Sequence, residues 1–93
     1  MSVLAIVKLV AKPGLRVSLL EVIRPAVSAT REQPACTSVE LVCGIENEEV
    51  LLLVERRQSV HDHEDFINGV IATGGLDEVM DLLAADIETS HYR

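Results

Sequence analysis

Two stretches of the chain are apolar on both faces of a strand. Residues 50–54 are all aliphatic, and in residues 3–10 both sets of alternating positions are aliphatic apart from Lys8. A strand with one face in water alternates apolar and polar residues, whereas a strand covered on both faces does not. We therefore predict two central strands of one sheet, at 3–10 and from residue 50 onwards, with cover needed on both faces.

The remaining segments carry helix, edge-strand and turn patterns. Apolar residues recur every three or four positions in the helical segments, and a strict alternation marks the edge strand. Ser59 followed by Asp62 has the spacing of a helix N-cap. The predicted elements are a helix at 15–32, an edge strand at 37–43, an acidic turn at 44–48, a helix from Ser59 to the interruption at 73–75, a short helix at 76–84 and a polar strand at 87–92.

This order of elements predicts a single α+β domain over residues 1–93 with the ferredoxin-like β-α-β-β-α-β arrangement. In that fold the antiparallel four-stranded sheet has the order 4-1-3-2, which puts both two-sided strands in the centre. The helices cover one face of the sheet. The other face is apolar, and a second copy of the chain is the simplest cover, so we predict a homodimer through the sheet face.

Composition narrows the classes of function. The chain is 48% hydrophobic but only 2% aromatic, so its core is aliphatic and a site built on stacked aromatic side chains is disfavoured. The net charge of −7 argues against nucleic acid and anionic membranes as partners, because both require a basic surface. No apolar run approaches the roughly 20 residues that span a bilayer.

The two cysteines predict a reduced, cytoplasmic protein. Cys36 and Cys43 lie seven positions apart, outside any CxxC or zinc-ligand spacing. Along a strand that separation is roughly 23 Å, which is too far for a disulfide. The first residues lack a basic region and carry Lys8 within their apolar run, so we expect no signal peptide.

Several ordered stretches of the sequence resemble the antibiotic biosynthesis monooxygenase family. They begin with Val-Lys-Leu-Val-Ala-Lys-Pro-Gly and run through Leu-Leu-Leu-Val-Glu-Arg, at residues 7–14, 19–21, 24–25, 29–36, 39–41 and 51–56. The resemblance implies a dimeric α/β barrel, in which two ferredoxin-like sheets meet face to face. It also implies cofactor-independent monooxygenation of a small aromatic or quinol-like substrate.

The sequence departs from that family at two positions. Arg57 stands where members commonly carry Trp, and His63 stands where they commonly carry an aromatic residue. The chain has no Trp and no Asn in its first strand, which argues against the haem degradation of some relatives. Two alternatives therefore stay open: a non-catalytic dimeric binding module of the same fold, and a lyase or isomerase acting on a small acid.

Four residues are candidates for the site. His63 shares the apolar side of its helix with Phe66, so we expect both to face a pocket between helix and sheet, with His63 as catalytic acid or base and Phe66 against the substrate. Arg57 and Glu55 share a strand face and would bind and orient a substrate. The structural alternatives are a hydrogen-bonded core histidine and an ion pair at the strand end.

No metal or organic cofactor is expected. His61 and His63 are two positions apart on a helix and point in different directions, so they cannot hold one ion. No glycine-rich phosphate loop is present, since Gly74-Gly75 lacks the surrounding pattern. His91, in the polar last strand, is expected on the surface.

Overall fold

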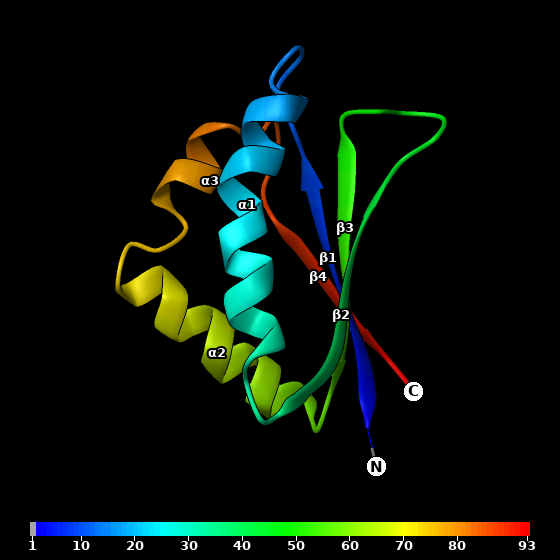
Figure 1. Ribbon diagram of the computed structural model, residues 1–93, viewed down its shortest axis with the longest axis vertical. Coiled ribbons are helices and arrows are strands. Elements are labelled where there is room, and N and C mark those ends of the chain that lie inside the picture. The colour runs from blue at the N-terminus through cyan, green and yellow to red at the C-terminus, as the bar shows by residue number, and fades with distance from the viewer. Residues whose placement is uncertain (1) are drawn as a thin grey trace.

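A computed structural model describes residues 2–93 of the chain. The elements follow one another as β1 (Val3–Val10), α1 (Arg16–Arg31), β2 (Cys36–Cys43), β3 (Val50–Arg57), α2 (Val60–Ala72), α3 (Asp77–Asp81) and β4 (Glu88–Tyr92). The helices lie together on one side of a twisted sheet (Figure 1). This is the predicted α+β ferredoxin-like arrangement.

The four strands form one antiparallel sheet with the order β2-β3-β1-β4. The predicted order is thereby confirmed, and the two strands with apolar residues on both faces are the central pair. Their register places Lys8 opposite Leu52 and Val3 opposite Arg57. The last strand pairs with β1 so that His91 lies opposite Ala5.

Most element ends agree with the sequence patterns, and the exceptions have local causes. Ser59 caps α2 as predicted, because its side chain accepts a hydrogen bond of 3.0 Å from the backbone N–H of Asp62. The third helix is shorter than the predicted 76–84. After Asp81 the backbone pairs with the end of β1 instead, where the N–H of Ala84 donates to the carbonyl of Val10 at 2.8 Å.

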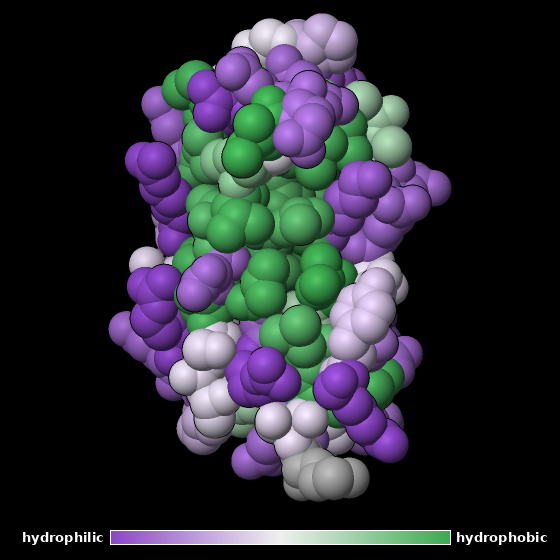
Figure 2. Space-filling view, turned by 90° about the vertical axis from the view of Figure 1, so that its right-hand side faces the viewer, coloured by the Kyte–Doolittle hydropathy of each residue, from purple (hydrophilic) through white to green (hydrophobic). Residues whose placement is uncertain are grey.

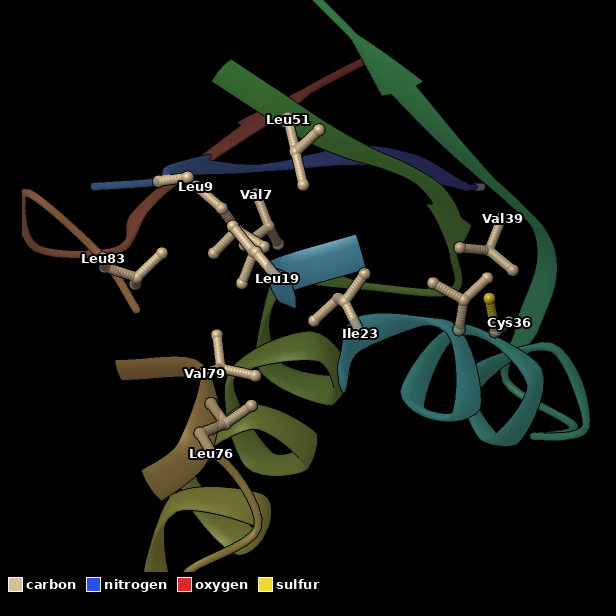
Figure 3. Packing of buried hydrophobic residues seen from close by; sticks show 12 residues of the cluster. Val7, Leu9, Leu19, Ile23, Cys36, Val39, Leu51, Leu76, Val79 and Leu83 are labelled. Atoms are coloured by element: carbon tan, nitrogen blue, oxygen red, sulfur yellow. The ribbon is translucent and has the colours of Figure 1, made fainter. Parts of the chain in front are cut away.

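The core lies between the sheet and the helices (Figure 3). Alternate residues of β1 point into it, and α1 contributes a buried stripe at helical spacing. The central members are Val7, Leu9, Leu19, Ile23, Val39, Leu51, Val79 and Leu83. No helix of residues 2–93 is long and apolar enough to cross a membrane.

The opposite face of the sheet is apolar as well. Figure 2 shows a continuous hydrophobic band on this face, framed by polar residues. No helix in the described part of the chain covers it (Figure 1). The alternation along the two central strands places these side chains on it: Leu4, Ile6, Val10, Val50, Leu52 and Val54.

We expect a second copy of the chain to cover this open face. Ile6→Lys would bury an unpaired ammonium in the interface and weaken self-association roughly a hundredfold or more. Val17→Lys is the matched control, because Val17 is 59% exposed on α1, away from the sheet. Sedimentation or light scattering measures the effect. A folded wild-type species of 10.2 kDa at micromolar concentration would contradict this expectation.

Candidate functional site

Two charged residues are buried at the end of β3. The strand alternation that turns Leu51 and Leu53 toward the helices also turns Glu55 and Arg57 toward them, and these are 2% and 1% exposed. His63, on the first turns of α2, faces the same region and is 0% exposed. The structure thus brings together three of the residues that the sequence analysis selected.

Arg57 is held by four neighbours. Its Nε and one terminal nitrogen donate to Oε1 of Glu55 at 3.0 and 2.8 Å. The other terminal nitrogen donates to Oε1 of Gln33 at 2.8 Å and to Oδ2 of Asp62 at 3.4 Å. The guanidinium carbon lies 4.6 Å from the ring centre of Phe66. The guanidinium of Arg57 therefore makes its hydrogen bonds within the protein. Two of these bonds hold the carboxylate of Glu55 in position.

Glu55 is an ionised carboxylate in an apolar setting. Burial by itself raises its pKa, but the contacts with His63 and Arg57 outweigh burial and hold the pKa below its usual value. Oε1 receives both hydrogen bonds from Arg57, whereas Oε2 lies 3.6 Å from Nε2 of His63. That separation is longer than a hydrogen bond, so Oε2 retains capacity to accept one.

Both ring nitrogens of His63 face side chains of the protein. Nε2 faces Glu55, and Nδ1 lies 3.0 Å from Nε2 of His91 on β4. His91 is half-buried rather than on the surface, which corrects the expectation from sequence. The sequence of β4 does not predict this burial, because β4 is polar at alternating positions and does not indicate which face of the strand lies toward the helices. The pairing of His91 with Ala5 reveals it.

Several cavities surround this cluster. One, of about 510 Å³, is open and is lined by Gln33, Asp62 and Phe66, which contact Arg57. Two others have Glu55 or His63 in their lining. The first of these two, of about 180 Å³, is partly open and is lined mostly by apolar side chains of α1, α2 and β3, with Thr30, Glu55 and Phe66 also in its wall. The second, of about 370 Å³, opens beside β4 and is lined by His63, His91, Asn68 and Thr89 among others. We call these the apolar cavity and the polar cavity. Arg57 lines neither of these two cavities.

The other candidates contribute no site. His61 is exposed and pairs with Asp65 at 3.2 Å, away from the buried His63. No group of three or more potential metal-ligating side chains occurs within residues 2–93. Cys36 is buried, and burial raises its pKa, which disfavours the reactive thiolate.

Comparison with known proteins identifies the fold. No family model and no curated protein matches the chain. Among solved structures, a conserved protein from Methanosarcina mazei Go1 superimposes with a TM-score of 0.85 at 16% identity, covering 100% of this chain and 92% of that one. An antibiotic biosynthesis monooxygenase superimposes with a TM-score of 0.83 at 15% identity, covering 98% and 96%. The chain has the fold of these proteins.

The depressed pKa of Glu55 predicts a specific loss of stability in acid. The unfolded chain binds this proton at higher pH than the folded chain does, so protonation favours unfolding. The free energy of unfolding should begin to fall as the pH drops below the pKa of Glu55 in the unfolded chain, about 4.3. It should continue to fall until the pH has passed the lower pKa of Glu55 in the folded chain. Glu55→Gln should remove this part of the pH dependence, whereas Glu46→Gln, in an exposed turn, should not. Urea unfolding across this pH range tests it, and identical slopes for the wild type and Glu55→Gln would refute it.

Proposed function

We propose that this protein is a cofactor-independent monooxygenase of the antibiotic biosynthesis type, acting on a small hydroxylated aromatic ring. The observation that carries the proposal is the ionised Glu55 in the wall of an otherwise apolar cavity between sheet and helices. The shared fold supports it, although a fold alone does not determine an activity.

The apolar cavity has the size of one substituted ring. Its volume of about 180 Å³ exceeds the roughly 150 Å³ of an engineered cavity that binds benzene. Phe66, Leu53, Ile67 and Val70 supply apolar contact with the ring. Molecular oxygen is apolar too, so a mostly apolar lining favours both reactants over water.

Glu55 would orient the substrate and raise its reactivity. A ring hydroxyl donating to Oε2 makes a charge-assisted hydrogen bond, which draws the proton away and leaves electron density on the ring. Arg57 fixes the carboxylate through Oε1, and His63 faces Oε2 from the other side. His63 then assists through Glu55, because neither of its ring nitrogens faces the apolar cavity.

The chemistry balances without an external reductant. A phenol with a free para carbon reacts with O2 to give the quinone and water. One oxygen atom enters the ring and the other leaves as water, taking up the hydroxyl proton and the proton from carbon. All the electrons come from the ring, so no redox cofactor enters the proposal.

A binding module is the second candidate, because Arg57 and His63 are already occupied by protein partners. Such a protein would hold the same ring without oxidising it. The lyase or isomerase alternative is less well supported, since it needs a cation for the acid and Arg57 lines neither cavity.

Oxygen consumption with a panel of phenols and hydroquinones tests the proposed function. We expect turnover by the wild type and a fall in kcat of roughly a hundredfold in Glu55→Gln, the magnitude typical of a lost proton-transfer or oxyanion contact. Glu46→Gln is the matched control and should retain full activity. Calorimetric binding of a ring without oxygen uptake would favour the binding module. Unchanged kcat in Glu55→Gln would contradict the assigned role.

A further inference from the structure

We propose that His91 is a general base in the polar cavity, and that His63 and Glu55 behind it form a carboxylate–imidazole–imidazole relay. This inference concerns the polar cavity and stands without the monooxygenase function. It rests on three observations: the contact between the two imidazoles, the position of the Glu55 carboxylate beside His63, and the lining of the polar cavity.

The two imidazoles share a hydrogen bond. Nδ1 of His63 and Nε2 of His91 are 3.0 Å apart, and the ring centres are 5.1 Å apart with the planes inclined at 74°. The two nitrogens therefore lie between the ring centres and face one another. Two bare lone pairs at this distance would repel, so one of the nitrogens carries a proton and donates to the other.

Glu55 determines which nitrogen donates. Nε2 of His63 is buried, has no hydrogen-bond partner within residues 2–93, and faces the Glu55 carboxylate at 3.6 Å. A proton on this nitrogen is attracted to the carboxylate, whereas a lone pair there is repelled. His63 therefore holds its proton on Nε2 and accepts through Nδ1 from His91. The remaining nitrogen of His91, Nδ1, then carries an unprotonated lone pair that can act as a base.

The position of Glu55 determines where a transferred proton leaves its charge. Glu55 is 2% exposed and lies 3.6 Å from Nε2 of His63, whereas the second carboxylate at Arg57, that of Asp62, is 31% exposed and is screened by water. When Nδ1 of His91 takes a proton from a ligand, the Nε2 proton of His91 passes to Nδ1 of His63. The positive charge then lies on His63, beside the carboxylate of Glu55, and the ligand is left as an anion.

The lining of the polar cavity defines the ligand. Asn68 and Thr89 offer neutral hydrogen-bonding groups, and Glu64 adds an acid. Among the described residues, no Lys or Arg lines it, so it does not select anions. Its volume of about 370 Å³ is within the range of small-molecule sites. The ligand that fits is a neutral molecule with a weakly acidic hydroxyl. Since His91 and Thr89 lie on the helix side of β4, a partner on the open face leaves this cavity accessible.

Imidazole nitrogen NMR of ¹⁵N-labelled protein tests the relay directly. We expect the neutral His63 ring to be protonated at Nε2 and the neutral His91 ring to be protonated at Nε2 as well. A His63 ring protonated at Nδ1 would disconnect Glu55 from His91 and overturn the proposal.

Anaerobic titration with 4-nitrophenol tests the base. The phenolate of this probe is coloured, so absorbance at a pH well below the pKa of the free probe reports proton transfer to the protein. We expect the wild type to produce the coloured anion. In His91→Gln, which keeps a donor toward His63, the absorbance of this anion should fall at least tenfold. His61→Gln is the matched control. Colour retained in His91→Gln, or absent from the wild type, would overturn the assignment. Because oxygen is excluded, neither result depends on monooxygenation.

Discussion

The ion pair between Glu55 and Arg57 is the interaction on which the site depends. Taking two charges out of water costs several kcal/mol per ion, and this is recovered only when the pair has good geometry and further hydrogen bonds. Here Arg57 makes two bonds to Glu55 and one each to Gln33 and Asp62. These partners lie on β3, on the segment after α1 and on the first turn of α2. The pair therefore joins three segments of the chain at one point.

The same pair is connected to both cavities through Glu55 and His63. Arg57 fixes Oε1 of Glu55, whereas Oε2 lies 3.6 Å from Nε2 of His63, and Glu55 also lines the apolar cavity. His63 in turn holds His91, which lines the polar cavity. The helix-covered face of the sheet thus holds the buried polar side chains, while the open face is an apolar surface (Figure 2).

The fold was predictable because its signals are local or periodic. Both central strands carry apolar residues on both faces, apart from Lys8 and the charged end of β3, and the Ser59 side chain caps α2. The pairing of Arg57 with Glu55 could also be predicted from the sequence, since residues two apart share a strand face. The roles of Gln33 and His91 could not be predicted. Gln33 contacts Arg57 across 24 positions of the sequence, and His91 contacts His63 across 28 positions. Neither contact leaves a pattern in the sequence; both come from the packing of distant segments.

A double-mutant cycle on Arg57 and Glu55 tests the central claim most directly. Arg57→Met leaves the Glu55 charge buried and unpaired, and should lower the free energy of unfolding by about 3–5 kcal/mol, whereas adding Glu55→Met should recover much of that loss. The exposed pair of Lys8 and Glu88, 3.7 Å apart, is the reference cycle and should couple by less than about 1 kcal/mol. Denaturant unfolding gives both coupling energies. Strong coupling only in the buried pair is the predicted result, and equally weak coupling in the two pairs would contradict the account.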